Sequence, residues 1–242
     1  MSKKYWEFKN QTDDTADLYL YIQIASWGGG CYAHSAQSFK QELDALGNIK
    51  SLNVYINSPG GDVFEGSAIY NMLKRFKADV NVYIDGVAAS IASVIAMSGK
   101  TVNMPKNSML MIHNAWTYVE GNSDDLRKMA NTLDKVNTSI RQAYLSKAGD
   151  KLDEETLIKL MDATTWLTAQ ECYDYGLCDN LLDEVNIAAC VKGMDFKAYK
   201  NVPKALIVKN EEPPEGEQED PKELKANNEL ELAKALLLLE LQ

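Results

Sequence analysis

Residues 51–76 read SLNVYINSPGGDVFEGSAIYNMLKRF, and this stretch decides the fold class. The apolar run at 51–57 predicts a strand, and SPGG at 58–61 predicts a turn. Apolar residues spaced three or four apart over 64–76 predict an amphipathic helix, and a further strand, VNVYI at 80–84, follows directly. A strand, a covering helix and a second strand in this order are typical of a parallel sheet in an α/β protein.

The same alternation continues on both sides of this stretch. Upstream, Leu18–Ile24 predicts a strand, and Ser35 is a suitable N-cap for a helix after it. Downstream, the Ala-, Ser-, Val- and Ile-rich residues Gly86–Gly99 predict a buried helix. Thr101–Met104 and Met109–Ile112 predict two short strands, so we expect several βαβ units in one sheet.

The second half of the chain predicts mainly helices. Apolar residues at helical spacing run through Ser123–Lys147, which is long for a helix in a domain of this size. We expect this helix to project and to pack against a partner subunit. Shorter helices are predicted at Asp153–Met161 and Thr168–Tyr175, and a strand is predicted at Leu181–Val185.

The acidic charge of the chain is concentrated at its C-terminal end. The 242 residues carry a formal net charge of −10, and residues 210–242 hold ten acidic residues and three lysines, a net charge of −7. The remaining chain therefore carries only −3. We predict one folded domain over 1–205, an acidic disordered linker over 206–222 and a C-terminal helical segment over 223–242.

Several classes of protein do not fit this composition. A net acidic chain is a poor binder of nucleic-acid phosphates, and no apolar run is long enough to predict a membrane span. The polar N-terminus shows no secretory signal, so we expect a cytoplasmic protein. The four cysteines, Cys31, Cys172, Cys178 and Cys190, form no C-x-x-C pair. We therefore expect reduced thiols, no metal site and no cofactor.

Three features could carry chemistry, and each also has a purely structural interpretation. The SPGGD turn at 58–62 could present backbone N–H groups to an anion, or could only connect a strand to a helix. Ser90, which follows the strand at 80–84, could be a nucleophile or a small residue for close packing. His113 ends an apolar strand and could be a base or a structural histidine, whereas His34 lies in a loop and is expected at the surface.

The three features gain weight when they are considered together. Each follows a strand of the predicted parallel sheet, and the carboxyl ends of such strands meet at one edge, where α/β proteins place their sites. A serine, a histidine and a pair of glycine amides supply the nucleophile, base and oxyanion donors that acyl transfer needs. The residues alone therefore predict an acyl-transfer site.

Four motifs in order carry a resemblance to a known family. SPGGDVFEG, VYIDGVAASIAS, MLMIH and WLTAQECYDYGLCD follow one another, and over residues 15–190 the chain resembles the proteolytic subunit of Clp protease. Within that family it looks most like the phage and prophage head maturation (prohead) proteases. Housekeeping subunits carry Gln-Pro after the histidine, whereas this chain has Asn114-Ala115.

The resemblance implies a fold, a site and an assembly. The fold is α/β, a ClpP/crotonase-like spiral of βαβ units with a long projecting helix and a C-terminal tail. Ser90 matches the nucleophile, His113 the general base, and Gly61 and Ile91 the residues whose backbone N–H groups form the oxyanion hole, while Gly60 shapes the turn. The resemblance also implies a ring homo-oligomer whose long helices join two rings, with protein or peptide substrates.

The third member of the site is left open by the sequence. The family carries an aspartate two residues before the aromatic residue that here is Trp166, and this chain has Thr164 at that position. Asp162 is the nearest carboxylate, and we predict that it orients His113. Thr164 as a neutral partner and the absence of any third member are the alternatives.

These features predict a serine endopeptidase that forms an acyl-enzyme inside an oligomeric chamber. The phage resemblance and the acidic tail favour processing of capsid or scaffold protein in an assembling prohead. An alternative is protein turnover with a separate ATPase, since this chain carries no G-x-x-x-x-G-K-[ST] motif. Further alternatives are a catalytically weak or inactive assembly protein, a crotonase-like acyl-CoA enzyme, and a serine–lysine peptidase that uses Lys100 as its base.

Overall fold

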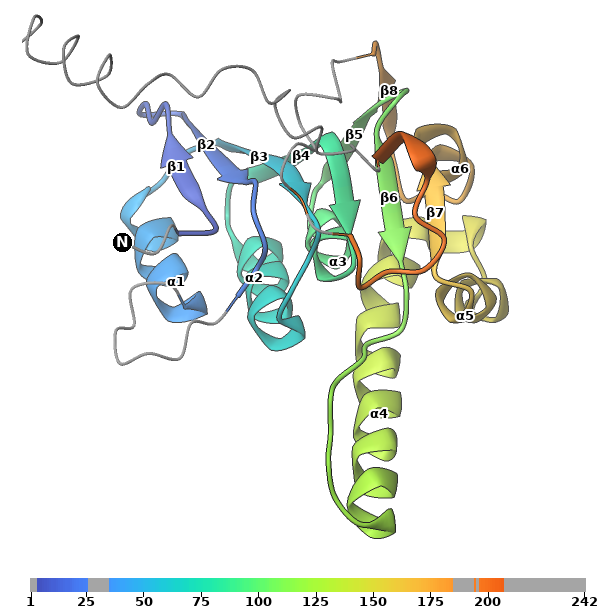
Figure 1. Cartoon of the computed structure of the whole chain (residues 1–242). Helices are drawn as coiled ribbons and strands as arrows, with labels where there is room; N and C mark the ends of the chain where they lie inside the picture. Colours follow the sequence, from blue (N-terminus) through green and yellow to red (C-terminus); the bar gives the residue numbers. More distant parts are fainter. Residues whose placement is uncertain (1–3, 26–34, 185–193, 195, 207–242) are drawn as a thin grey trace, which may run out of the picture. The chain divides into compact units, whose positions relative to one another are not determined.

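The computed structural model describes residues 4–25, 35–184, 194 and 196–206 (Figure 1). The chain divides into two units, Met1–Val208 and Lys209–Gln242, and the second unit lies outside the described residues. The predicted acidic linker, all but its first residue, and the predicted C-terminal helical segment therefore stay predictions.

The cysteines and His34 are only partly covered by the described residues. Cys172 and Cys178 are buried free thiols, and burial raises the pKa of both well above its ordinary value, to about 11 for Cys178. Thiols of this kind stay protonated and unreactive at neutral pH. His34, Cys31 and Cys190 lie outside the described residues, so the predictions for them are untested.

Among the described residues, the centre of the first unit is one sheet of eight strands. The strands are β1 (Glu7–Lys9), β2 (Thr15–Leu20), β3 (Ser51–Ser58), β4 (Asp79–Ala89), β5 (Thr101–Pro105), β6 (Met109–Ile112), β7 (Thr165–Thr168) and β8 (Asn180–Leu182). The helices are α1 (Ala36–Ala45), α2 (Val63–Arg75), α3 (Ile91–Ala96), α4 (Ser123–Ala148), α5 (Glu154–Asp162) and α6 (Ala169–Asp174), with short 3-10 turns η2 (Gly149–Lys151) and η3 (Lys204–Leu206).

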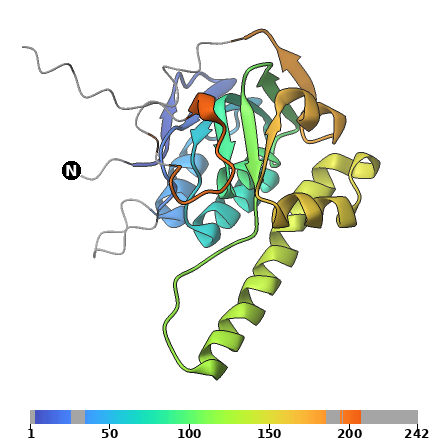
Figure 2. The ribbon, with the colours of Figure 1, turned by 45° about the vertical axis from the view of Figure 1, so that its right-hand side comes forward.

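Strand β4 changes its partner half-way along its length. Its first half, through Asn81–Tyr83, pairs with β5, whereas Val87–Ala89 pair with β6. The strand order is β1-β2-β3-β4-β5-β8, while β6 pairs with β4 and β7 pairs with β6. Figure 2 shows the same ribbon turned by 45°, with the long helix α4 extending away from the sheet. All pairs are parallel except β1 with β2 and β6 with β7. The end of β4 therefore lies beside the end of β6.

Alternating burial along the central strands identifies the core face of the sheet. Leu52, Val54 and Ile56 of β3 are completely buried, and Phe39 of α1 and Ile69 of α2 belong to the same core. Burying apolar side chains of this size contributes about 1.5–3 kcal/mol each. The intervening positions of β2, β3 and β4 carry a row of stacked tyrosines, Tyr19, Tyr55 and Tyr83.

The predicted buried helix over Gly86–Gly99 is wrong in its first part. Residues up to Ala89 continue strand β4, and only Ile91–Ala96 are helical. Small apolar residues of this kind are compatible with a helix and with a strand. Val87–Ala89 form a strand because they pair with β6. Strand β2 also lies a few residues upstream of the predicted Leu18–Ile24, and the sequence missed β1 and β7 altogether.

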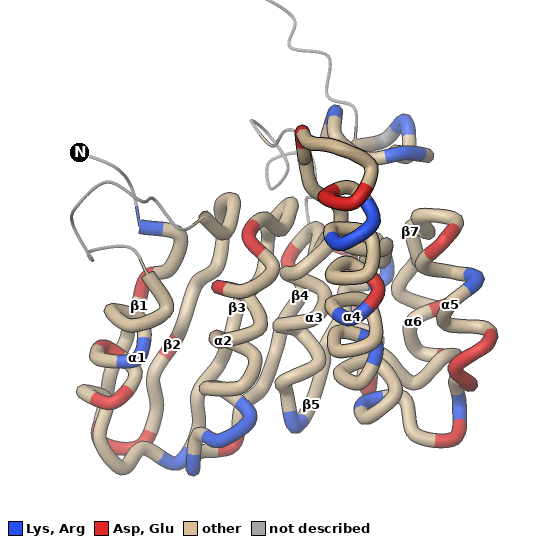
Figure 3. The backbone as a smooth tube through the Cα atoms, turned by 90° about the horizontal axis from the view of Figure 1, so that it is seen from below, with Lys and Arg blue, Asp and Glu red and all other residues tan. Residues whose placement is uncertain are grey.

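Helix α4 confirms the predicted long helix in its extent and its projection from the sheet (Figure 1). Asn122 caps its first turn, and buried residues such as Ile140 and Tyr144 lie only in its C-terminal half. Leu126, in the projecting half, is 45% exposed. Positions of basic and acidic residues alternate along α4 in the backbone tube of Figure 3, so the charged residues of α4 are of both signs. An apolar stripe is thus left partly uncovered within the described part of the chain.

Candidate active site

Ser90 occupies the junction between β4 and α3 in a strained backbone conformation. Its φ is 55° and its ψ is −130°, a combination that costs a non-glycine residue about 1–3 kcal/mol. Its N–H donates to the carbonyl of Met111 at 2.9 Å, and its own carbonyl accepts from the backbone N–H of Ser93 at 2.9 Å. The strain is therefore held in place by hydrogen bonds on both sides of the residue.

A buried hydroxyl pair supports this junction from behind. The Ser93 Oγ donates to the Ser90 carbonyl at 2.5 Å and lies 2.6 Å from the hydroxyl of Tyr144, on α4. Burial raises the pKa of Tyr144, so its hydroxyl is protonated at neutral pH. The buried end of α4 thereby fixes the start of α3.

His113 lies one residue beyond the end of β6 and contacts Ser90 directly. Its Nε2 is 2.7 Å from the Ser90 Oγ. Burial lowers the pKa of His113 to about 4, so the imidazole is neutral at pH 7 and can accept a proton. The predicted meeting of the two residues at one edge of the sheet is what the structure shows, and a nucleophile beside a neutral base is what acyl transfer requires.

The turn after β3 presents the glycine pair to Ser90. The Gly60 carbonyl accepts from the N–H of Ile24 at 2.7 Å, and the N–H of Asp62 donates to the Ile24 carbonyl at 2.8 Å. A Cβ on Gly60, whose φ is +93°, would lie 2.6 Å from the Ala89 carbonyl oxygen and 2.7 Å from the Ser90 Cβ. Only glycine permits so close an approach of this turn to the serine.

Two backbone N–H groups beside Ser90 remain available. Neither the Gly61 N–H nor the Ile91 N–H donates to an acceptor among the residues that the structure describes. Gly61 follows Gly60 in the turn, and Ile91 follows Ser90 at the start of α3. Such donors can stabilise an oxyanion that forms on a carbonyl attacked by the serine.

The structure does not bring Asp162 into contact with His113. The Asp162 carboxylate accepts from the Asn114 Nδ2 at 2.6 Å, and within the described parts of the chain no hydrogen bond joins it to the imidazole. Thr164 has a φ of 54° and donates its N–H to the Met161 carbonyl. No described interaction joins its hydroxyl to His113 either. The role predicted for Asp162 stays a prediction.

A cavity of about 830 Å³ opens at the Ser90–His113 pair. Apolar residues supply much of its wall, including Phe64 from α2, Trp116 from the loop after β6, and Leu133 from α4. Phe64 and Trp116 are 70% and 50% exposed. A cavity of this size and polarity suits the side chains of a bound peptide.

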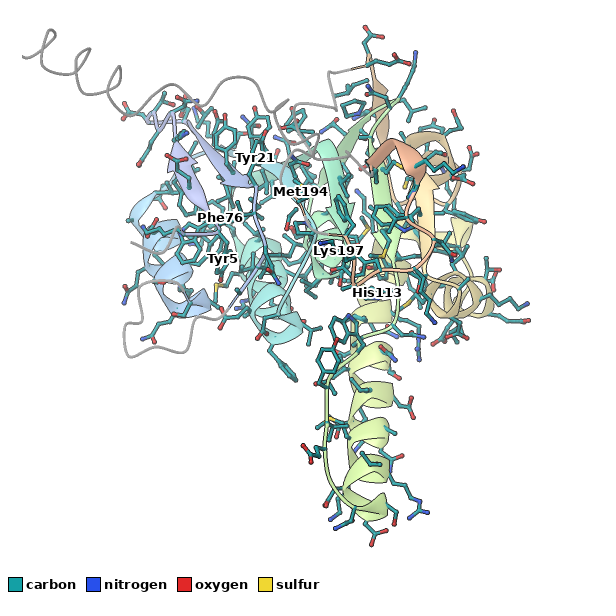
Figure 4. All side chains as sticks on the ribbon, viewed as in Figure 1. Tyr5, Tyr21, Phe76, His113, Met194 and Lys197 are labelled. Atoms are coloured by element: carbon teal, nitrogen blue, oxygen red, sulfur yellow. The ribbon has the colours of Figure 1, made fainter. Side chains whose placement is uncertain are left out.

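Sequence reasoning missed the part that residues 194 and 196–206 play at this cavity. Figure 4 labels Met194 and Lys197 of this segment and His113 at the end of β6. Met194, Ala198 and Tyr199 line the cavity, and the Tyr199 ring packs against His113 with 5.2 Å between ring centroids. The segment reads MDFKAYKNVPKAL, which matches none of the motifs above.

No metal-binding group emerges from the residues that the structure covers. Within them, no three His, Cys, Asp or Glu side chains are grouped so that they could hold a metal ion. Over the same residues, no helix has the length and hydropathy needed to span a membrane.

Comparison with known proteins assigns the family. The family model described as Clp protease matches residues 23–185. The chain belongs to the Clp protease family. This assignment agrees with the mixed α/β sheet and confirms the predicted fold class. It also makes the chain a serine-type peptidase, a hydrolase.

Three relatives of this Clp protease family member carry the same name, ATP-dependent Clp protease proteolytic subunit. The one from Ligilactobacillus salivarius (strain UCC118) is 38% identical over 143 residues, 58% of this chain and 71% of the relative. The one from Deinococcus radiodurans is 34% identical over 145 residues, 59% and 70% of the two chains. The one from Bacteroides fragilis (strain ATCC 25285) is 31% identical over 153 residues, 62% and 72%.

These relatives change the weight of the predicted functions. Their shared name matches the alternative of ATP-dependent proteolysis better than the prohead interpretation, and none of the three is named for head maturation. The family match also favours a peptidase over a crotonase-like acyl-CoA enzyme. The individual roles of Ser90, His113, Gly61, Ile91 and Asp162 stay predictions, and the geometry above is their support.

Proposed function

We propose that the chain is the proteolytic subunit of a Clp-type protease and hydrolyses peptide bonds through an acyl-enzyme on Ser90. The observation that carries the proposal is the 2.7 Å contact between the Ser90 Oγ and the Nε2 of a buried, neutral His113. The family match and the three relatives support the same reaction. The proposed nucleophile and base are thus in contact, in a chain that belongs to a family of peptidases.

The reaction follows from the positions of these groups. The Ser90 Oγ attacks the scissile carbonyl carbon while the His113 Nε2 takes its proton. The N–H groups of Gly61 and Ile91 donate to the oxyanion that forms, and His113 returns the proton to the leaving amine. Water, activated by the same imidazole, then releases the acyl group from Ser90.

We still propose Asp162 as the third member of the catalytic site, acting on His113 indirectly through Asn114. Its carboxylate accepts from the Asn114 amide, and Asn114 follows His113 directly in the chain. Asp162 can therefore influence the loop that carries the base without an ion pair to the imidazole. This arrangement predicts a small catalytic effect for Asp162.

We further propose that the subunit assembles into rings and works with a separate ATPase. The exposed apolar side chains of Trp116, Tyr118, Val119 and Leu126, beside and along α4, are suited to burial between subunits. The chain has no phosphate-binding G-x-x-x-x-G-K-[ST] motif, so ATP hydrolysis must come from another chain. The ATPase and the proteolytic subunit would then act on the same substrate, an unfolded protein.

Processing of capsid or scaffold protein in a prohead is the second candidate. One observation favours it: residues 210–242, with a net charge of −7, extend beyond the family match, which ends at residue 185. A phage-encoded enzyme of this kind would work in the host cytoplasm or in the assembling prohead. Incubation with an unfolded model protein, with and without a Clp ATPase and ATP, separates the two candidates. Turnover that requires the ATPase supports the first, and ATPase-independent cleavage of a scaffold protein supports the second.

A fluorophosphonate probe tests the catalytic assignment. The full chain is incubated with the probe, and the labelled residue is identified by peptide mass mapping. We expect label on Ser90, none in Ser90→Ala, and a labelling rate about 10²–10⁴-fold lower in His113→Ala. A folded protein that takes up no label at Ser90 would contradict the proposal.

Ser98→Ala is the matched control for this experiment. Ser98 lies just after α3, is buried, and its Oγ has no hydrogen-bond partner among the described residues. Its replacement should leave the labelling of Ser90 unchanged. Particle images of the same sample test the assembly, and a monodisperse monomer would count against the ring.

A further inference from the structure

Among the described residues, hydrogen bonds fix only one side of the His113 ring. Its Nε2 contacts Ser90, and no hydrogen bond within the described parts of the chain involves its Nδ1. The nearby carboxylate of Asp162 is engaged by Asn114 instead. A general base must hold its lone pair toward the proton that it takes, so another group has to restrain this ring.

Tyr199 makes the contact that can supply this restraint. Its ring meets the imidazole nearly at right angles, with an interplanar angle of 81° and 5.2 Å between centroids. Edge-to-face packing of this kind is directional and resists rotation of either ring. The Tyr199 hydroxyl donates to the Pro59 carbonyl at 2.6 Å, which ties the tyrosine to the turn that carries Gly60 and Gly61.

The Tyr199 hydroxyl keeps its proton at neutral pH. Burial raises the pKa of Tyr199, and the effect of the Ser90 side chain, which lowers this pKa, is the smaller one. The phenol therefore donates to the Pro59 carbonyl. One residue thus contacts the base and the turn that presents the oxyanion donors.

The chain around Tyr199 is anchored on both sides. The Trp166 Nε1 donates to the Lys200 carbonyl at 3.1 Å, and the Asn201 Nδ2 donates to the Ala163 carbonyl at 3.0 Å. Phe196 packs against Trp166 with 5.6 Å between ring centroids. The tyrosine is consequently held by β7 and the residues before it, as well as by its own hydroxyl.

A small apolar cluster fixes the ends of the same segment. Phe196 and Leu206 are 6% and 5% exposed, and they pack with Val87, Ala89 and Met111 beneath the ends of β4 and β6. A cavity of about 830 Å³ remains beside Ser90 with Tyr199 in its wall. Tyr199 therefore borders the space for a substrate and leaves it open.

We propose that Tyr199 is a positioning residue that holds the His113 imidazole toward Ser90 in place of a direct carboxylate partner. The proposal rests on the function proposed above for Ser90 and His113. It makes the segment Phe196–Leu206, which lies beyond the family match, a part of the working site. Its effect falls on the rate of the chemical step, because the tyrosine orients a reacting group.

The test compares two replacements of Tyr199 in the full chain. Rates of Ser90 labelling are measured over a range of concentrations of a small fluorophosphonate, which separates the maximal rate from the half-saturating concentration. Tyr199→Leu, which removes the aromatic edge, should lower the maximal rate about tenfold or more, because small misplacements of reacting groups have large effects. The half-saturating concentration should change by about twofold at most. Tyr199→Phe keeps the ring on His113 and should stay within about threefold of the parent rate.

Control variants separate positioning from loss of structure. Tyr173→Leu replaces a tyrosine on α6 that is 40% exposed and does not line the cavity, and it should leave both parameters unchanged. Trp166→Phe removes the donor to the Lys200 carbonyl and loosens the segment, so it should lower the maximal rate to a smaller extent than Tyr199→Leu. It decides the question if Tyr199→Leu does not fold.

The possible outcomes are distinct. A maximal labelling rate in Tyr199→Leu equal to that of the parent protein would overturn the proposal. If Tyr199→Leu does not fold, the same result in Trp166→Phe would overturn it. A faster rate in Tyr199→Leu would also overturn it and would identify Tyr199 as an obstruction of the site. A parent protein that is not labelled at Ser90 would overturn the proposed function itself, which is a separate failure.

Discussion

The nucleophile and the base of this site are held in different ways. Ser90 is fixed by its neighbours on every side, through the Met111 carbonyl, the backbone and hydroxyl of Ser93, and the close glycine turn. The backbone of His113 follows directly after β6, but among the described residues its ring is held only by packing and by the contact with Ser90. The geometry of the serine is therefore local and rigid, whereas that of the histidine depends on a residue 86 positions later in the chain.

Because of this difference, mutations near Ser90 and mutations near His113 should have different effects. Changes near Ser90 should disturb the fold together with the chemistry, because the same hydrogen bonds serve both. Changes around the His113 ring should disturb the chemistry alone.

Gly60→Ala should have the largest effect on the surroundings of Ser90. The new Cβ would lie 2.6 Å from the Ala89 carbonyl oxygen at a φ of +93°, so the turn must move away from Ser90. We expect the free energy of unfolding to fall by about 2 kcal/mol or more and Ser90 labelling to be largely lost. Urea unfolding and probe labelling measure the two effects.

Gly47→Ala is the control for this change. Gly47 also has a positive φ, +71°, but a Cβ there meets nothing within 4 Å. It should carry only the backbone cost of about 1 kcal/mol and leave labelling intact. Equal behaviour of the two variants would show that the close approach of the turn is unimportant.

Ser93→Ala should weaken the same side through its buried hydroxyl pair. The change leaves the Tyr144 hydroxyl without its partner and removes a donor to the Ser90 carbonyl. We expect a loss of about 1–3 kcal/mol in the free energy of unfolding. Ser98→Ala, at a buried hydroxyl without a partner among the described residues, should have almost no effect, and a similar loss in both variants would refute this explanation.

The pH dependence of labelling tests the base side. The pKa of His113 is lowered from 6.5 to about 4 by burial, so the imidazole stays neutral and active well below pH 6. The labelling rate should change little between pH 7.5 and pH 5.5, whereas an imidazole with the ordinary pKa would lose about tenfold over that range. A midpoint near pH 6.5 would show that the ring is not desolvated.

The same shift affects stability, and the sign follows from proton binding. Between about pH 6.5 and pH 4 the unfolded chain binds a proton at His113 and the folded chain does not, so the contribution of this residue to stability falls as the pH is lowered. The midpoint temperatures of thermal unfolding of the parent and of His113→Gln should therefore approach each other as the pH falls from 6.5 to 4.

Asp162→Asn should have the smallest effect. The carboxylate reaches His113 only through Asn114, so we expect labelling to fall by about threefold or less. Asn114→Ala, which removes the other partner, should give an effect of similar size. A loss of about tenfold or more in Asp162→Asn alone would mean that a direct ion pair with the imidazole forms during the reaction.

The sequence was most informative where structure is local. Regular apolar spacing predicted α2 and α4, and the strand-turn-helix motifs placed Ser90 and His113 at one edge of the sheet. Sequence could not show that Val87–Ala89 extend a strand, because small apolar residues suit a helix as well and pairing with β6 decides. Tyr199 was missed for a related reason, since its role depends on contacts with Pro59 and His113 that are distant in the chain.

The exchange of partners along β4 has a mechanical consequence for catalysis. The Ser90 N–H donates to the carbonyl of Met111 in β6, and His113 is the first residue after the end of that strand. The backbones of the nucleophile and the base are thus connected by the hydrogen bonds between the end of β4 and β6. This pairing does not involve β5, which pairs with the earlier part of β4, or β8. Bending or opening elsewhere in the sheet can change the shape of the cavity while the spacing between the two reacting side chains is preserved.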